Sequence, residues 1–324
     1  VSMALYGAGV WSLAGQIISY AIISGILLWF CSKWRPSFIF SFTALKELWG
    51  FGFRMFLSQI LDSVFTRLDY LIIGKLFTPD VLGYFQRAKQ FNLLVIKFTS
   101  GSLMSVLFPV LSKIQNDLPR FQLVVLKTLH ILSFTVFLML GGLYLVSEEV
   151  IVFLYSEKWL PSVSYMQLLL LSGFGYPLSA LLVNVLSSRG NSKLFLRLEI
   201  LKKLVHSVNF LNAIYFGIES YLYGLIMVTI IGLSLNIIFA AKEIKLSLLE
   251  FYKPITIQLL LCVLCVSCTL LTLSSFNFNY LIGFFFKGCL FVVLFTGLNI
   301  LFRTQSFLEI FDQLAPLVKK KIRD

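Results

Sequence analysis

Charged residues are scarce in this chain of 324 residues, where they make up 13% of the sequence. An ordinary soluble domain carries about 25%. Histidine occurs only twice and cysteine five times. The sequence also lacks an HExxH motif, a nucleophile elbow and a glycine-rich phosphate loop. We therefore expect no enzymatic activity, no cofactor and no metal site.

Three cysteines, Cys262, Cys265 and Cys268, follow one another at a spacing of three in one apolar run. This spacing resembles a metal or redox motif, but no histidine or carboxylate accompanies it. Free cysteine behaves as a small hydrophobic residue, so we interpret these three as packing or lipid-facing residues.

Apolar residues dominate instead, at 58% of the sequence with a mean hydropathy of +0.90. Apolar runs of about 20 residues, long enough to cross a bilayer as helices, recur along the chain. A membrane β-barrel would show weaker alternating segments of about 10 residues. The sequence predicts an all-α polytopic membrane protein. In that class a net charge of +12 indicates loop orientation, and we expect no nucleic-acid partner.

Nine membrane spans can be placed along the chain. They cover residues 8–30, 49–73, 82–111, 122–146, 161–187, 197–216, 221–241, 255–274 and 280–302. Fifteen basic residues fall in the connections and tail on one side, against Lys75 and Lys158 on the other. The positive-inside rule places the basic side, including the C-terminus, in the cytoplasm. The chain begins at Val1, and we expect it to be truncated at its N-terminus. With nine spans Val1 would lie outside, so an odd number of helices is expected upstream if the true N-terminus is cytoplasmic.

The region from Leu48 to Gln115 carries more charge than a lipid-facing helix tolerates. Ionisable side chains cost at least about 2.5 kcal/mol each at the centre of a membrane helix, so they face a bundle interior or a water-filled path. We interpret the two helices of this region as cavity walls. Their charged residues are Arg54, Arg67, Arg87, Lys89 and Lys97 against Asp62 and Asp69.

This excess of cations predicts a cargo with an anionic head group, because Arg and Lys are the usual partners of phosphate. Arg87, Lys89 and Lys97 are the first candidates for head-group attraction, followed by Arg54 and Arg67. Asp62 and Asp69 are assigned to tuning these cations or to ion coupling. The alternative is that Asp62 or Asp69 forms an ion pair with Arg67 or Arg87 that holds the helices together.

Two further spans carry marked residues. In the sixth span, Lys202, His206, Asn209 and Asn212 share one helical face at about 100° per residue. Lys202 could instead extend to the membrane interface, and a lone histidine is often a packing residue. The fifth span contains Gly173, Gly175 and Pro177, which predict a hinge or, alternatively, a static kink.

Several stretches resemble the Wzx-like polysaccharide flippases, the branch with colanic acid and teichuronic acid exporters in the multidrug/oligosaccharidyl-lipid/polysaccharide superfamily. The resemblance covers about the first two-thirds of the chain. It rests on GAGVWSLAGQ at 7–16, LWFCSKWRP at 28–36, KELWGFGFRMFLSQILDSVFTRLDYLIIGKLFTPDVLGYFQRAKQF at 46–91, LFPVLSKIQND at 107–117, YSEKWLPSV at 155–163 and RGNSKLFLRLEILKK at 189–203.

Such flippases have two six-helix lobes around a central cavity, often with two further helices. The resemblance therefore implies that the chain is the C-terminal part of a two-lobed fold, with five helices expected upstream. Residues 1–30 would be the last helix of the first lobe, 31–48 a cytoplasmic connection and 49–241 the second lobe. Residues 242–302 would be the two additional helices and 303–324 a basic cytoplasmic tail.

The resemblance implies a flippase of the bacterial inner membrane. Its cargo would be an undecaprenyl-pyrophosphate-linked glycan, moved by alternating access for surface polysaccharide biosynthesis. Membrane lipid, a polysaccharide polymerase and chain-length proteins would be its partners. Three alternatives stay open: a cation-coupled multidrug exporter of the same superfamily, a membrane-embedded polymerase or acyltransferase, and a non-functional gene remnant.

Overall fold

The computed structural model describes residues 7, 9, 11–32, 35, 40–273 and 279–312, without the side chains of residues 13, 47 and 102–105. The basic residues Lys319, Lys320, Lys321 and Arg323 of the predicted tail lie outside the described residues. The chain divides into two compact units, Val1–Trp49 and Gly50–Asp324. Each is described by itself.

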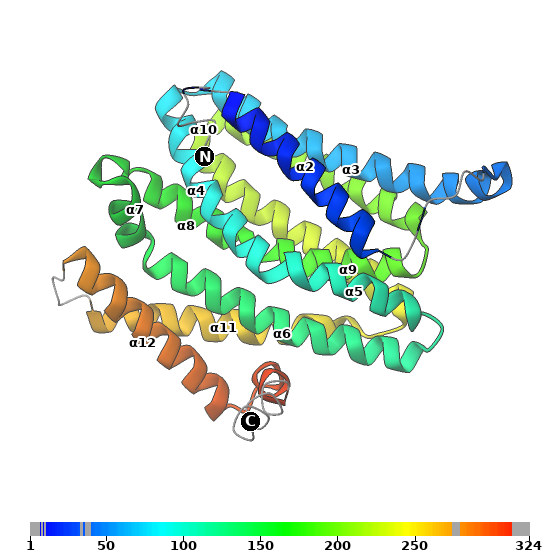
Figure 1. The fold of residues 1–324 in the computed structure, drawn as a ribbon. Helices are drawn as coiled ribbons and strands as arrows, with labels where there is room; N and C mark the ends of the chain where they lie inside the picture. Colours follow the sequence, from blue (N-terminus) through cyan, green and yellow to red (C-terminus); the bar gives the residue numbers. More distant parts are fainter. Residues whose placement is uncertain are drawn as a thin grey trace. The chain divides into compact units, whose positions relative to one another are not determined.

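The described residues form helices joined by short connections, and no strand occurs among them. The first unit contains α2 (Trp11–Cys31), and α3 (Phe42–Leu76) carries the chain into the second. The second unit continues with α4 (Pro79–Ile96), the π-helix η1 (Lys97–Gly101), α5 (Ser102–Lys113), α6 (Leu118–Leu145), α7 (Ser147–Tyr155), the 3₁₀ helix η2 (Glu157–Trp159), α8 (Ser162–Gly173), α9 (Gly175–Ser188), α10 (Ser192–Ile244), α11 (Leu248–Leu273) and α12 (Tyr280–Leu301) (Figure 1).

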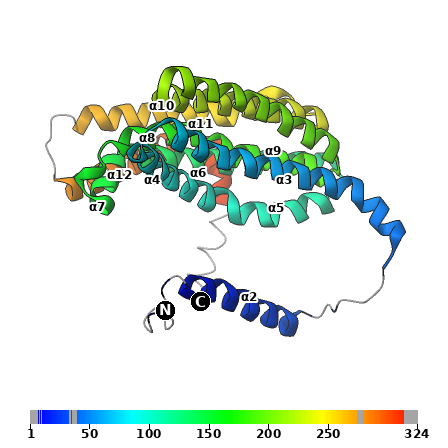
Figure 2. The ribbon, with the colours of Figure 1, turned by 90° about the horizontal axis from the view of Figure 1, so that it is seen from above.

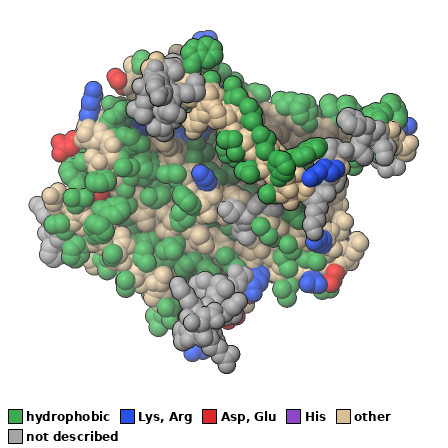
Figure 3. Space-filling model, in the orientation of Figure 1, with side chains coloured by type: hydrophobic (Ala, Val, Ile, Leu, Met, Phe, Trp, Pro, Cys, Tyr) green, Lys and Arg blue, Asp and Glu red, His purple; other side chains and the backbone are tan. Residues whose placement is uncertain are grey.

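Seven helical segments in the described part of the chain are long and apolar enough to cross a membrane. On the face shown in Figure 3, apolar side chains are widespread and charged side chains are few. Such a surface suits a hydrocarbon environment, in which helices satisfy their own backbone hydrogen bonds. The prediction of an all-α polytopic membrane protein is confirmed.

Two helices, α3 and α10, differ from the predicted spans. α3, with its arginines and aspartates, is not one of the seven segments. α10 spans 53 residues but consists of two helices joined at Gly217, which has φ 86° and ψ −177°, a conformation essentially restricted to glycine. Asn209 Nδ2 donates a hydrogen bond of 3.0 Å to the carbonyl of Tyr221, although 12 residues of straight helix would span about 18 Å. The chain therefore folds back, and α10 supplies both predicted spans, 197–216 and 221–241.

The connection predicted near residues 147–160 is itself structured. α7 begins with Glu148 and Glu149 in its first turn, where carboxylates complement the helix dipole. Lys287 of α12 forms an ion pair with the buried Glu149 at 2.5 Å. This short helix is thereby tied to the C-terminal part of the bundle.

The second unit has two apolar clusters. One is centred on α6, α9, the second half of α10, α11 and α12, with Phe291 and Phe295 fully buried. α11 and α12 pack along α6, as Figures 1 and 2 show. Cys262 and Cys265 are buried in this cluster and Cys268 is exposed, all as free thiols. The other cluster joins α4, α8 and the fold-back of α10, around Phe85 and Tyr221.

α8 and α9 divide the predicted fifth span at Phe174. Pro177 has no N–H, so the carbonyl of Gly173, four residues earlier, lacks its usual helical donor. Both glycines lie against neighbours: a Cβ at Gly173 would lie 2.4 Å from Asn92 Oδ1, and one at Gly175 would lie 2.2 Å from Thr229 Cγ2. The break predicted at Gly173, Gly175 and Pro177 is present, and it is closely packed.

Candidate functional site

A cavity of about 830 Å³ lies inside the second unit, within the range of about 300–1,000 Å³ typical of ligand sites. We refer to it as the main cavity. Its walls come from α3, α4 with η1, α8, α9 and both halves of α10. The acidic and basic residues that line it are Asp62, Asp69, Lys89, Lys97, Glu199, Lys202, Lys203 and His206.

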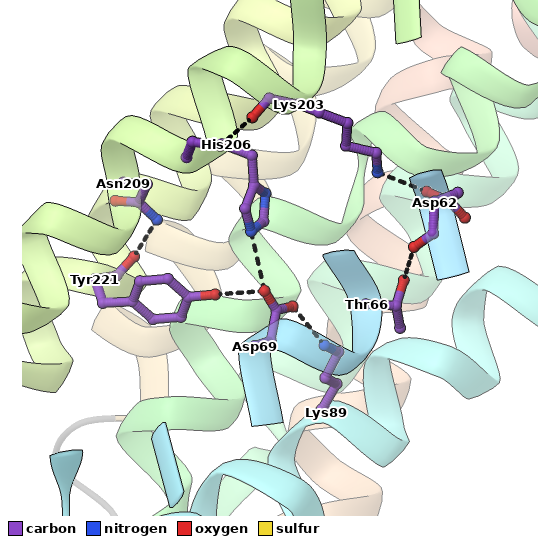
Figure 4. Close-up of polar contacts among 9 residues, drawn as sticks. Asp62, Thr66, Asp69, Lys89, Lys203, His206, Asn209 and Tyr221 are labelled. Carbon is purple, nitrogen blue, oxygen red and sulfur yellow. Dashed lines mark hydrogen bonds and ion pairs between the residues drawn. The ribbon is translucent and has the colours of Figure 1, made fainter. Parts of the chain in front are cut away.

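Asp69 of α3 is the centre of the polar contacts in this cavity. Its Oδ1 lies 2.9 Å from His206 Nε2 and accepts a hydrogen bond of 2.9 Å from the Tyr221 hydroxyl. Its Oδ2 accepts from Lys89 Nζ at 2.8 Å. Figure 4 shows the three side chains converging on this carboxylate from α4 and from both halves of α10. Because Asp69 is only 6% exposed, these contacts replace the water that a carboxylate otherwise needs.

Aromatic rings surround the two cationic or potentially cationic partners of Asp69. Lys89 Nζ lies 4.6 Å from the centroid of the Tyr70 ring, within the range of a cation–π interaction. The His206 ring lies edge-on to Phe65 and Phe210, at centroid distances of 5.8 and 4.9 Å. These rings pack against both side chains where they contact Asp69.

A second ion pair joins α3 to the first half of α10. Lys203 Nζ lies 2.7 Å from Asp62 Oδ1. Towards the start of both helices, Arg54 Nε donates to Ser192 Oγ at 2.9 Å. Together with Asp69 and His206, these contacts attach α3 to α10 at three levels along its length.

Lys202 and Glu199 form an ion pair within α10. Both side chains line the main cavity. The interpretation of Lys202 as a residue extending to the membrane interface is therefore not needed, because its ammonium group has a carboxylate partner inside the lobe.

Lys97 differs from the other cavity lysines. It is exposed to the cavity and has no ion pair or hydrogen bond of its ammonium group with any described residue. It begins η1, and Thr99 and Ser100 of this π-helix donate to the carbonyls of Val95 and Ile96, each at 2.7 Å. π-Helical segments occur frequently at functional sites. The structure thus places one free ammonium group where the helix is irregular.

The charge balance of the main cavity is less one-sided than the sequence predicts. Four lysines face three carboxylates, Asp62, Asp69 and Glu199, and each carboxylate has a lysine partner. The alternative of ion pairs that join helices is realised for Asp62 and Asp69. Their partners, however, are Lys203, Lys89 and His206, and not the expected Arg67 or Arg87.

The arginines predicted from the sequence do not line the main cavity. Arg54 contacts Ser192 as described, and Arg67 is exposed on α3. Arg87 lines a second, smaller pocket of about 430 Å³ with Tyr70, Gln86, Gln90 and Leu93. Of the five predicted cationic residues, the structure thus brings only Lys89 and Lys97 to the main cavity, together with Asp62 and Asp69.

Sequence reasoning missed Lys203 and Glu199 as cavity residues, and it missed Tyr221 as a hydrogen-bond partner of Asp69. The stripe of Lys202, His206, Asn209 and Asn212 did indicate the correct face of α10. Lys203 is offset by one position from that stripe, and its long side chain reaches Asp62 nonetheless. Tyr221 lies beyond the fold-back at Gly217, so its approach to Asp69 has no signal in the helical spacing.

Among the described residues there is no cluster of three or more histidine, cysteine or acidic side chains that could hold a metal ion. The site offers four ammonium groups, three of them paired with buried or half-buried carboxylates, in a cavity inside a membrane helix bundle. Such a site can bind an anion by exchanging one ion pair for another.

Comparison with known proteins found relatives with partial coverage. The Teichuronic acid biosynthesis protein TuaB of Bacillus subtilis is 23% identical over 252 residues, 75% of this chain and 52% of the relative. The Lipopolysaccharide biosynthesis protein WzxC of Escherichia coli is 25% identical over 177 residues, 53% of this chain and 36% of the relative. The Succinoglycan biosynthesis transport protein ExoT of Rhizobium meliloti is 24% identical over 159 residues, 49% of this chain and 32% of the relative.

The chain thus spans about half the length, or less, of these curated relatives. Comparison with solved structures gave no match. A family model described as Polysaccharide biosynthesis protein matches residues 1–164, half of the chain, including Asp62, Asp69, Lys89 and Lys97. The resemblance to Wzx-like polysaccharide flippases is confirmed, and the chain belongs to this family of polysaccharide biosynthesis proteins.

Proposed function

We propose that this protein moves an undecaprenyl-pyrophosphate-linked oligosaccharide from the inner to the outer leaflet of the bacterial cytoplasmic membrane. The support is the family membership, the relatives named for teichuronic acid, lipopolysaccharide and succinoglycan biosynthesis or transport, and the lysine-lined cavity. The protein acts as a transporter, and the chemistry of the cargo does not change.

The observation that carries this proposal is the free ammonium group of Lys97 in the main cavity. A pyrophosphate needs positive charge on arrival, and Lys97 has no carboxylate partner among the described residues that it would have to release first. Lys89 would join it by leaving Asp69, which keeps His206 and Tyr221 as partners. Asp69 and a phosphate oxygen are both anionic acceptors, so each forms a charge-assisted hydrogen bond with the ammonium group of Lys89. Lys89 therefore remains paired when it exchanges Asp69 for the phosphate.

In this proposal, transport requires two states of the main cavity, each open to one side of the membrane. Rocking of two lobes about a site near the midplane would expose the cavity to each side of the membrane in turn. The polyprenyl tail would stay in the bilayer while the head group and sugars pass through. The C-terminus lies in the cytoplasm in this proposal, and a polysaccharide polymerase and chain-length proteins would take up the product outside.

A multidrug exporter of the same superfamily fits the cavity less well. Cationic drugs require an excess of carboxylates, whereas four lysines face three carboxylates here. Each of these carboxylates is also neutralised by a lysine. A drug cation would meet a free ammonium group at Lys97 and be repelled.

The decisive experiment replaces Lys97 by alanine in cells whose surface polysaccharide depends on this protein. We expect export to fall by about tenfold, the effect of losing roughly one charge-assisted hydrogen bond, and lipid-linked oligosaccharide to accumulate in the membrane. Lys113→Ala is the matched control, because Lys113 is exposed at the end of α5 and lines neither pocket. Equal export by both variants at matched protein levels would contradict the proposal.

A further inference from the structure

Arg87 and the pocket around it are not explained by the main cavity. The pocket of about 430 Å³ is lined by Tyr70, Gln86, Arg87, Gln90 and Leu93. We refer to it as the Arg87 pocket. It lies beside α4 at the end where the chain forms α7 and η2 (Figure 1), because Arg87 contacts residues of both.

The guanidinium group of Arg87 is held by two aromatic rings. Its Cζ lies 5.1 Å from the ring centroid of Tyr155 and 5.6 Å from that of Trp159. The two rings are 6.0 Å apart, and Tyr84 packs edge-on against Trp159 at 5.7 Å. This aromatic support orients the guanidinium before any ligand arrives, which lowers the entropy lost on binding.

The cation–π contacts of Arg87 with Tyr155 and Trp159 do not occupy its N–H donors. No described carboxylate forms an ion pair with it, although arginine presents five donors in a planar fork that suits an oxyanion. Arg87 is exposed and faces a pocket, so these donors are available. The pocket is therefore suited to a carboxylate or phosphate oxygen pair.

The other residues of the Arg87 pocket match sugar hydroxyl groups. Gln86 and Gln90 are exposed on the same face of α4, and each amide offers two donors and one acceptor oxygen. Gln90 Oε1 makes only a long contact of 3.5 Å with the Tyr155 hydroxyl. Tyr70 adds an aromatic ring on which the C–H face of a sugar can pack. A phospholipid phosphate would use Arg87 but would leave these amides without partners.

The Arg87 pocket adjoins the main cavity. Leu93 lines both, and the Tyr70 ring of the pocket lies 4.6 Å from the ammonium group of Lys89 in the main cavity. An extended oligosaccharide with its pyrophosphate near Lys97 and Lys89 could therefore reach Arg87 with a sugar further along the chain.

From this geometry we propose that the Arg87 pocket is a subsite for an acidic sugar, with the sugar carboxylate on Arg87 and its hydroxyls on Gln86 and Gln90. The inference rests on the proposed function, because it takes the ligand to be the transported glycan. It adds a selectivity that the main cavity does not provide: glycans with a carboxylate would bind better than neutral ones.

The test measures binding of a glucuronate-containing oligosaccharide to the purified chain in lipid nanodiscs, against the neutral glucose oligosaccharide of equal length. We expect tighter binding of the acidic one, and Arg87→Gln should weaken it by about 10- to 100-fold without changing the neutral one. Arg87→Lys keeps the charge but loses the fork, so its loss should be intermediate. Arg120→Gln, an exposed arginine of α6 outside both pockets, is the matched control.

Gln90→Leu gives a second variant that leaves the aromatic support of Arg87 in place. It should weaken both oligosaccharides several-fold, since it removes a hydroxyl partner. Unchanged binding in both Arg87→Gln and Gln90→Leu would overturn the subsite. So would displacement of the acidic oligosaccharide by phosphatidylglycerol in the nanodisc, which would identify a lipid phosphate as the ligand.

Export assays separate the two proposals. If Arg87→Gln loses acidic-sugar selectivity while deletion of the gene leaves export unchanged, the acidic-sugar site stands and the flippase proposal fails. If Lys97→Ala blocks export and Arg87→Gln leaves binding unchanged, the flippase proposal stands and the subsite fails.

Discussion

Asp69 and Asp62 form similar ion pairs, but burial changes how much each pair matters for the stability of the protein. The Asp69 side chain is 9% exposed and contacts Lys89, His206 and Tyr221, whereas the Asp62 side chain is 42% exposed and contacts Lys203. Removing one partner of a buried pair leaves an uncompensated charge in a dry environment. When a half-exposed pair loses one partner, water or the cavity contents solvate the remaining charge.

We predict that Asp69→Asn destabilises the protein by about 3–5 kcal/mol, since Lys89 and His206 lose their carboxylate. Asp62→Asn should cost only about 0–1 kcal/mol. Thermal unfolding of both variants in the same detergent measures the difference. Similar losses for the two variants would show that Asp69 is not the buried centre of the network.

The sequence indicated most of these residues but not their pairing. Asp62, Asp69, Lys89 and Lys97 stood out because charge is unusual in an apolar helix. Their partners were not predictable, because a lysine or arginine reaches several neighbouring helices and spacing along one helix does not tell which. For this reason the prediction that Arg54 and Arg67 line the cavity was wrong. Both lie on α3, but their side chains do not line the main cavity.

At the scale of elements, the break between α8 and α9 allows two interpretations, a hinge and a static kink. Gly175 lies against Thr229 of α10, and a Cβ there would lie 2.2 Å from Thr229 Cγ2. The close packing explains why glycine is needed, whether or not the break moves.

We predict that Gly175→Ala destabilises the protein by about 1–3 kcal/mol, the usual cost of overpacking. Adding Thr229→Ser removes Cγ2 and should restore the unfolding temperature. The double variant then separates the two interpretations in an export assay: normal export indicates a static kink, whereas export that stays low at restored stability indicates a hinge. A double variant as unstable as Gly175→Ala would contradict the packing explanation.

The length of α10 alone would suggest one straight helix, but the chain reverses direction within it. A continuous helix of 53 residues would be about 80 Å long, far beyond the hydrocarbon thickness of about 30 Å. The positive φ of Gly217 and the contact between Asn209 and Tyr221 turn it into an antiparallel pair. This reversal brings Tyr221 back to Asp69, so the site depends on the turn.

At the scale of the whole molecule, the fold-back of α10 has a consequence for topology. Three spans separate the connection at η2 from the one after α10: α8 with α9, and the two halves of α10. The two connections therefore lie on opposite sides of the membrane, and the turn at Gly217 lies on the same side as η2.

We predict that Glu157→Cys and Glu219→Cys, in a background without the native cysteines, react with a membrane-impermeant maleimide on intact cells. Ser247→Cys should react only after permeabilisation, because the positive-inside rule places its connection in the cytoplasm. All three positions are exposed. Labelling of Ser247→Cys alone on intact cells would reverse the orientation, and protection of Glu219→Cys under both conditions would contradict the fold-back.

The amino-acid sequence is sufficient to assign this protein to the all-α membrane proteins. Long apolar runs leave helices as the way to satisfy backbone hydrogen bonds in lipid, and charges within such runs must face one another or a cavity. These arguments need no knowledge of which helices meet, so they predict helical spans and charged cavity walls from the sequence.

Only the tertiary structure decided which charges meet. The pairing of Asp69 with Lys89 and His206, the free state of Lys97 and the separate pocket of Arg87 depend on how α3, α4 and α10 are placed around the cavity. Long side chains make many pairings sterically possible, and the packing of the helices selects one of them. The physical reason is that ion pairing depends on distances across helices, which the spacing along a single helix does not contain.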